Sequence, residues 1–320
     1  MSSAIVFAYH NVGVRCLRVL LAAGVEARLV LTHDDDPHEN VWFASVRQVC
    51  VDNDIACIAP ANPNTPEIEA RVAALNADFL FSFYYRQMLK APLLAAVTRG
   101  AYNMHGSLLP RYRGRAPVNW AVVHGERETG ASLHQMTVKP DDGAIVDQFS
   151  VPILPDDSAR DVFAKVTVAA ELCLYRALPQ LLAGTAEHSP QDLAQGAYFG
   201  GRRADDGRID WRLDARRVHD LVRAVTHPYP GAFTDLPGGR LALWRTRVID
   251  DAGDFASRGT LRWHDDRLEI FPLGGGSLQL LQGDFAGQPL SADKDVFRLD
   301  GQKLPPGIST VSNQLYETNS

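Results

Sequence analysis

The chain has 320 residues, 46% hydrophobic and 22% charged, which is the composition of an ordinary globular protein and enough length for two domains. Its formal net charge of −6 argues against a general nucleic-acid-binding surface, because such surfaces are basic. No basic segment followed by an apolar signal core stands at the N-terminus, and no uncharged apolar run is long enough to span a bilayer. The four cysteines are too scattered for a zinc site, so we expect reduced thiols in a cytoplasmic protein without membrane insertion.

The first residues predict a strand, a helix and a second strand. Residues 4–8 are an apolar run, a helical pattern runs from Val14 to Leu21 and stops at Gly24, and residues 27–31 are apolar again. This order predicts a parallel sheet with crossover helices. The Gly-x-Gly-x-x-Gly fingerprint is missing, which disfavours a dinucleotide site and hence a nicotinamide oxidoreductase.

An acidic segment follows at residues 32–39 and predicts a solvated loop with a helix cap. The alternative is a metal site formed by Asp34, Asp35, Asp36 and His38. It is disfavoured because adjacent carboxylates point in different directions, so we expect no metal.

Further helices are predicted near residues 41–51 and 66–75, and further strands at 56–59 and 79–83. An aromatic run, residues 84–86, leaves the carboxyl end of the last strand. Open α/β sheets bind ligands at that edge, so these rings form either part of the core or a platform for a flat heterocycle.

Residues 102–117 are the most informative stretch of the chain. Asn103 and His105 lie two apart in a predicted short strand, so their side chains share one face. Gly106 and Pro110 end the strand, and a loop with three arginines leads to a helix that begins near Pro117. An asparagine amide can donate to an oxyanion, and a histidine can transfer a proton near neutral pH. A structural, hydrogen-bonded pair is the alternative.

A third group is expected in the turn at residues 137–143, between strands predicted at 131–136 and 144–151. Asp141 is the candidate, since a carboxylate near His105 would hold the imidazole and raise its pKa. An Asp-x-Gly sequence alone is typical of an ordinary turn. His134 alternates with apolar neighbours, which predicts a structural role.

The rest of the chain predicts a second, smaller domain. A long amphipathic helix reaches about Leu182, so we place the first domain at residues 1–185 and a polar linker at 186–205. Residues 206–304 contain short strands with glycine-rich turns, which predict a small β-barrel, and residues 305–320 form a tail.

The run Asn103-x-His105-Gly106-Ser107-Leu108-Leu109-Pro110, followed by Asp141-x-Gly143, resembles the 10-formyltetrahydrofolate-dependent formyltransferases. The resemblance covers nearly the whole chain, with further similar runs at residues 6–10, 81–86, 199–203 and 223–233. It is closest to the formyltransferase domain of bifunctional polymyxin-resistance enzymes, which modify UDP-4-amino-4-deoxy-L-arabinose for lipid A. Because 320 residues leave no room for the second, decarboxylating domain of those enzymes, we expect a stand-alone formyltransferase.

The resemblance implies a Rossmann-like parallel-sheet domain followed by an OB-like barrel, and three catalytic residues. Asn103 would stabilise the oxyanion, His105 would transfer the proton, and Asp141 would hold His105. The 10-formyltetrahydrofolate co-substrate would contact these residues: Gln87, Met88, Leu89, Arg115, Thr137, Val138, Lys139, Pro140 and Asp141. The nucleotide-sugar substrate would contact these arginines: Arg113, Arg202 and Arg203.

The acceptor stays open among three alternatives: UDP-4-amino-4-deoxy-L-arabinose, another nucleotide-linked amino sugar, and initiator methionyl-tRNA. A tRNA acceptor calls for positive charge near the site, whereas residues 34–36 are three aspartates. A non-catalytic folate- or nucleotide-binding module is an alternative of another class, and the intact catalytic residues disfavour it. The sequence makes no prediction of the oligomeric state.

Overall fold

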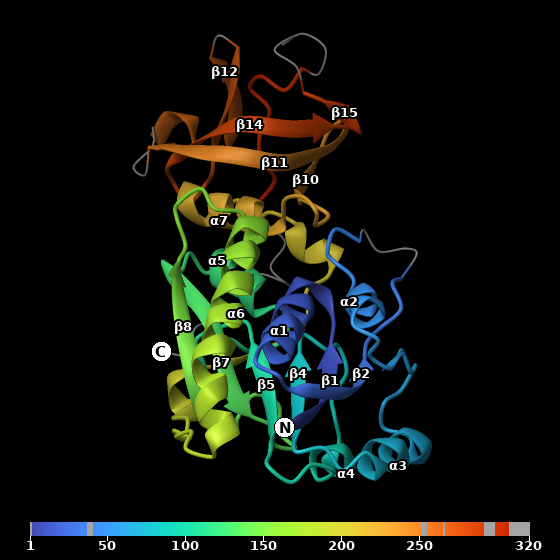
Figure 1. The fold of residues 1–320 in the computed structure, drawn as a ribbon. Helices are drawn as coiled ribbons and strands as arrows, with labels where there is room; N and C mark the ends of the chain where they lie inside the picture. Colours follow the sequence, from blue (N-terminus) through green and yellow to red (C-terminus); the bar gives the residue numbers. More distant parts are fainter. Residues whose placement is uncertain (1, 37–40, 251–254, 265, 291–297, 307–320) are drawn as a thin grey trace. The chain divides into compact units, whose positions relative to one another are not determined.

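The computed structural model describes residues 2–36, 41–250, 255–264, 266–290 and 298–306 (Figure 1). The chain divides into two compact units. The first unit contains residues 1–117, 128–152 and 163–200, and the second contains residues 118–127, 153–162 and 201–320. The predicted linker is thus divided, with residues 186–200 in the first unit and 201–205 in the second.

A seven-stranded sheet forms the centre of the first unit, in the order β3-β2-β1-β4-β5-β7-β8. Its strands are β1 Ser3–Ala8, β2 Glu26–Leu31, β3 Cys57–Ile58, β4 Phe79–Phe83, β5 Ala101–His105, β7 Glu128–Gln135 and β8 Ile145–Pro152. The five neighbouring strands β3, β2, β1, β4 and β5 run parallel to one another. Strand β7 is antiparallel to β5, and β8 is antiparallel to β7. Every residue of β1 and β4 is buried, as expected for parallel strands with both faces covered. The predicted parallel sheet is confirmed.

Five helices belong wholly or mostly to this unit: α1 His10–Ala22, α2 Val46–Asp52, α3 Pro66–Ala74, α4 Ala91–Leu94 and α6 Ala159–Ala183. Figure 1 shows α1 and α6 side by side over the sheet, where Arg15 Nε donates to Glu171 Oε2 at 2.7 Å. Among the described helices, α6 is the one that is long and apolar enough to cross a membrane. Half of its most apolar stretch is buried inside the protein, as in the core helix of a globular fold.

The second unit is built on an antiparallel sheet in the order β10-β11-β14-β13-β12, with β15 paired to β14. Its strands are β10 Ala232–Leu236, β11 Gly239–Asp250, β12 Thr260–His264, β13 Arg267–Phe271, β14 Ser277–Phe285 and β15 Gln288–Pro289. Its helices are α5 Pro117–Val123, most of which belongs here, and α7 Ala215–Val225. The predicted separate C-terminal domain of short strands is confirmed, and its strands form an antiparallel sheet. Most of the predicted tail, residues 307–320, lies outside the described residues.

Buried polar contacts fix the interior of the second unit. Trp211, fully buried, donates its indole N–H to Thr234 Oγ1 at 3.1 Å. On α7, the buried Arg223 and Asp220 form an ion pair at 2.8 Å, and Arg223 also donates to the Asp157 carbonyl at 2.9 Å. A charge buried in this way is stabilised by its partner and is costly if left alone.

Candidate functional site

Strand β5 brings the two predicted side chains to the carboxyl edge of the sheet. Asn103 and His105 lie on one face, and the antiparallel register places Asn103 opposite His134 of β7. Asn103 Nδ2 is 3.1 Å from His134 Nε2. A histidine for which the sequence predicted a structural role therefore lies beside the candidate catalytic residues.

The turn that follows β7 brings Asp141 to both imidazoles. Its Oδ1 atom is 3.5 Å from His105 Nδ1 and 3.5 Å from His134 Nε2, and its Oδ2 accepts the backbone N–H of Gly114 at 2.9 Å. We call Asn103, His105, His134 and Asp141 the polar cluster. The three predicted catalytic residues thus converge, from segments almost forty positions apart.

Burial decides the charge of the two central groups. The pKa of His105 is lowered, because burial outweighs the nearby Asp141 carboxylate and the Tyr112 carbonyl, both of which raise it, and His134 lowers it further. We expected Asp141 to raise the pKa of His105, and it acts in that direction without overcoming burial. Burial would by itself raise the pKa of Asp141, but His105, His134 and the Gly114 N–H together bring this pKa below its ordinary range. The site therefore holds a carboxylate beside an imidazole that is biased towards its neutral form.

The hydrogen-bond partners of His134 determine which of its ring nitrogens donates and how the Asn103 amide is oriented. His134 Nδ1 is 2.9 Å from the Gln135 carbonyl, which only accepts, so Nδ1 carries a proton. In neutral His134, Nε2 is then an acceptor for one N–H of Asn103. This contact orients the amide, and its second N–H is the one that can donate to a ligand.

His105 has an acceptor at each ring nitrogen. Nε2 is 2.8 Å from the Tyr112 carbonyl, and Nδ1 faces Asp141. For His105 to exchange a proton with a ligand, one of these contacts must give way, and the Tyr112 carbonyl is the uncharged partner of the two.

Two glycines allow close packing around the cluster. A Cβ on Gly106 would collide with the hydroxyl of Tyr84, which follows β4, and a Cβ on Gly143 would collide with the carbonyl of Gln135. The neighbouring atoms therefore leave little room for a side chain at Gly106 and Gly143 of the motif.

Most of the residues predicted to contact folate lie on two turns next to the sheet edge, and Arg115 lies on the loop with three arginines. Met88 and Val138 are exposed, whereas the Leu89 side chain is buried in an apolar cluster that also includes Met136. Leu89 can therefore offer a ligand only its backbone. Gln87 donates to the Ala61 carbonyl at 2.8 Å. The remaining predicted residues on these turns and on the arginine loop are Arg115, Thr137, Lys139, Pro140 and Asp141, and their contacts with folate stay predictions.

The three arginines predicted to bind substrate have partners within the protein. Arg113 Nη2 donates to the carbonyls of Leu193 and Gly196 at 3.3 and 3.2 Å, so it binds the segment that was predicted to be a linker. In the second unit, Arg202 lies 4.9 Å from the Trp120 ring, and Arg203 caps a short helical turn. Their contacts with substrate also stay predictions.

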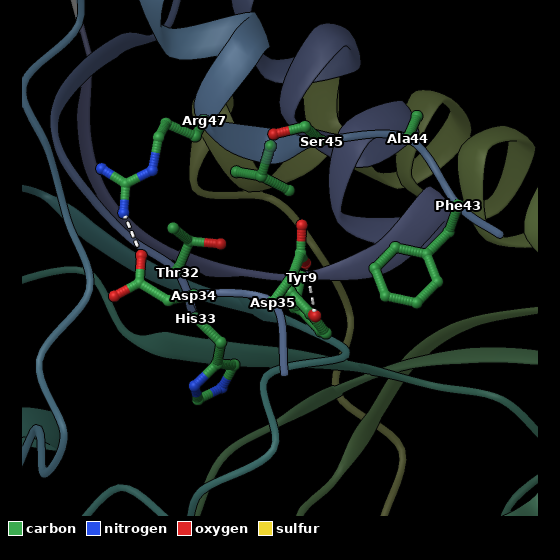
Figure 2. Close-up of a pocket in the computed structure, with 10 residues that line it drawn as sticks. Tyr9, Thr32, His33, Asp34, Asp35, Phe43, Ala44, Ser45 and Arg47 are labelled. Carbon is green, nitrogen blue, oxygen red and sulfur yellow. Dashed lines mark hydrogen bonds and ion pairs between the residues drawn. The ribbon is translucent and has the colours of Figure 1, made fainter. Parts of the chain in front are cut away.

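A cavity of about 140 Å³ opens at the carboxyl ends of β1 and β2 (Figure 2). Tyr9 and Phe43 line it with apolar surface, and His33 adds an imidazole. Figure 2 shows its two hydrogen-bonded pairs, Tyr9 to Asp35 at 2.7 Å and Arg47 to Asp34 at 2.6 Å.

Aromatic rings connect this cavity with the polar cluster. Tyr84, whose hydroxyl packs on Gly106, lies 5.6 Å from Phe163, and Phe163 lies 4.7 Å from His10. His10 lies 4.0 Å from Phe43 at the cavity. We call this row of rings, with Tyr9, the aromatic row.

Among the residues that the structure describes, no group of three or more His, Cys, Asp or Glu side chains could hold a metal ion. In the acidic segment, where a metal site was the alternative, Asp34 accepts from Arg47 and Asp35 accepts from Tyr9. His38 lies outside the described residues.

Comparison with known proteins identifies the family. The family model described as formyl transferase matches residues 19–178, and the model described as formyl transferase, C-terminal domain, matches residues 202–298.

Solved structures share the fold at low sequence identity. The N-formyltransferase from Helicobacter canadensis in complex with folinic acid and dTDP-3-aminofucose is 19% identical, with a TM-score of 0.70 over 91% of this chain and 100% of that one. WlaRD, a sugar 3N-formyl transferase solved with dTDP and 5-N-formyl-THF, is 18% identical, with a TM-score of 0.69 over 90% and 99%. HypX from Aquifex aeolicus is 18% identical, with a TM-score of 0.59 over 96% of this chain and 49% of its own. Because the two family models match most of its length, the chain belongs to the formyltransferase family and is a formyltransferase.

Proposed function

We propose that this formyltransferase moves the formyl group of 10-formyltetrahydrofolate to the amine of a nucleotide-linked amino sugar. The observation that carries the proposal is the convergence of Asn103, His105 and Asp141 at the carboxyl edge of the sheet, in a chain of this family. Two of the structural neighbours were solved with a folate and with dTDP or a dTDP-linked amino sugar.

The proposed reaction needs no covalent enzyme intermediate. The acceptor amine attacks the formyl carbon, the bond from that carbon to N10 breaks, and the amine's proton is transferred to N10. Asn103 donates its second amide N–H to the oxyanion that forms on the way. His105 exchanges its Tyr112 contact for the attacking amine and carries the proton, while the Asp141 carboxylate stabilises the imidazolium.

The aromatic row supports an acceptor with a flat base. It runs along the carboxyl ends of β4 and β1, where open α/β sheets bind nucleotides, and it ends at the cavity of Figure 2. Arg86 lies 4.7 Å from the Tyr9 ring, so it adds a cation beside this surface. An aromatic surface with a nearby guanidinium suits a nucleoside diphosphate better than the backbone of a tRNA, which requires an extended basic surface.

For the acceptor itself, we propose UDP-4-amino-4-deoxy-L-arabinose first, on the sequence resemblance, which would link the enzyme to lipid A modification. A dTDP-linked 3-amino sugar is the competing candidate, favoured by the ligands of the two neighbours.

A panel of acceptors tests the proposal. The enzyme is mixed with 10-formyltetrahydrofolate and, separately, with UDP-4-amino-4-deoxy-L-arabinose, a dTDP-3-amino sugar, or methionyl-tRNA, and products are read by mass spectrometry. We expect the mass gain of one formyl group on an amino-sugar nucleotide. Formylation of the tRNA alone, or of nothing in the panel, would refute the proposed substrate class.

A further inference from the structure

Residues 186–200, expected as a polar linker, lie across two loops of the first unit, and we call them the strap. Ser189 exchanges two backbone hydrogen bonds with Ile145 of β8, both of 2.8 Å. Further along, β9 Tyr198–Phe199 pairs in parallel with β6 Arg113–Gly114. The strap is thus anchored on both sides of its middle.

Gln191 lies between these anchors and reaches the turn that carries Asp141. Its Nε2 donates to the carbonyl of Asp141 at 3.0 Å and to the carbonyl of Gly143 at 2.6 Å. The reverse amide orientation would set an oxygen against two carbonyls, so the partners determine the orientation. Its Oε1 is buried without a hydrogen-bond partner in the part of the chain that the structure describes. Leaving an acceptor unsatisfied is unfavourable, which indicates that the two donated bonds matter.

The backbone at Asp141 needs such support. Its φ angle is +55°, in the left-handed region, which is disfavoured for a residue with a Cβ, although aspartate adopts it more readily than most residues. The Gly114 N–H that binds the Asp141 carboxylate also belongs to β6, which is paired with the strap. The strap therefore restrains both the backbone and the carboxylate of Asp141.

We infer that Gln191 is a positioning residue for formyl transfer, which holds the turn so that the Asp141 carboxylate meets His105. This rests on the proposed roles of Asp141 and His105. Without the two donated bonds, the turn would relax towards ordinary backbone angles and carry the carboxylate away from the imidazole.

The variant Gln191→Met tests this, because methionine has a similar length and no donor. We expect kcat to fall about tenfold or more, since a displacement of about 1 Å near a reacting group can cost about a hundredfold. The KM values for both substrates should change less. The imidazole of His105, followed by NMR, should titrate at lower pH, because Asp141 raises its pKa against burial and against His134.

Gln195→Met is the matched control on the same strap. Gln195 is exposed, and its side-chain amide donates to Asp192 Oδ2 at 3.0 Å, away from the Asp141 turn. This variant should keep the kcat and the His105 titration of the wild type.

The two readouts separate the inference from the proposed function. If the wild type formylates no amino-sugar nucleotide, the proposed function fails. The NMR titration of His105 in the wild type and in the variants still tests the positioning role of Gln191. An unchanged titration in folded Gln191→Met, with or without loss of activity, would overturn the inference. Folding is checked by circular dichroism and thermal melting. If Gln191→Met does not fold, Gln191→Asn, which is one methylene too short to hold both carbonyls, is judged by the same criteria.

Discussion

Asp141→Asn removes the negative charge from the polar cluster and keeps the shape of the side chain. In the structure, Asp141 Oδ1 is 3.5 Å from His105 Nδ1, and both side chains are nearly buried. Opposite unit charges at this distance attract by about 5 kcal/mol at an effective dielectric constant of about 20. Loss of this attraction should make the imidazolium of His105 about a thousandfold less populated, since about 1.4 kcal/mol corresponds to tenfold.

Two consequences can be measured. The kcat for formyl transfer should fall about a hundredfold or more, which is the usual contribution of acid–base catalysis. His105 should remain neutral to lower pH, as seen in its NMR titration. Asp142→Asn is the matched control, because the Asp142 carboxylate accepts from the Thr137 hydroxyl and has no contact with His105.

The pH dependence of stability gives a separate test with a definite sign. Folding lowers the pKa of His105. Its contribution to the free energy of unfolding is therefore complete above pH 6.5, the pKa in the unfolded chain, and is lost as the pH falls through the lowered pKa. Asp141→Asn removes a partner that raises this pKa, so the variant should lose more stability than the wild type below pH 6.5. The lowered pKa of Asp141 stabilises the wild type, and this contribution is lost only below pH 3.8. The variant has no carboxylate at this position, so it shows no such loss of stability below pH 3.8. Wild-type kcat and identical urea-denaturation profiles from pH 7 to 4 would refute the assigned role of Asp141.

Three further predictions concern other parts of the chain. Arg223→Met leaves the buried Asp220 carboxylate without its partner, so urea denaturation should show a loss of about 3–5 kcal/mol in the free energy of unfolding. Cys57 should react first with a thiol reagent near pH 7.5, because a hydrogen bond with Cys50 lowers the pKa of Cys57 to about 7. Gly106→Ala should slow formyl transfer in a steady-state assay, because the added methyl group must displace the Tyr84 hydroxyl beside the polar cluster.

Each of these three predictions has its own control. Arg217→Ala on the exposed face of the same helix should change stability by only about 0.5 kcal/mol, and an equal loss in both variants would contradict the burial argument. Fast labelling that persists in Cys57→Ser would disprove the thiol assignment. Tyr84→Phe removes the colliding hydroxyl, so it should restore part of the activity of Gly106→Ala.

The parallel sheet and three residues of the polar cluster could be predicted because their signals are local. Alternation in a short strand places Asn103 and His105 on one face, and the turn chemistry around Asp141 marks a loop end. His134 was assigned a structural role, because its place opposite Asn103 depends on the register between β5 and β7, which no local pattern encodes.

Long-range packing explains the other differences. Burial lowers the pKa of His105, although a carboxylate neighbour alone predicts the opposite direction. Residues 186–200 have the composition of a polar linker, and their role as a strap depends on pairing with β6 and β8. Arg113 has the residue type of a phosphate ligand, but its guanidinium binds two carbonyls of that strap.

Rapid-quench measurement of formyl transfer by the wild type and by His105→Ala tests the central claim most directly. The acceptor is the amino-sugar nucleotide that the panel identifies, and thermal melting confirms that the variant is folded. We predict that the wild type transfers the formyl group in a single turnover and that the variant is slower by about a hundredfold or more. Transfer at the wild-type rate by folded His105→Ala would contradict the assignment of proton transfer to this cluster.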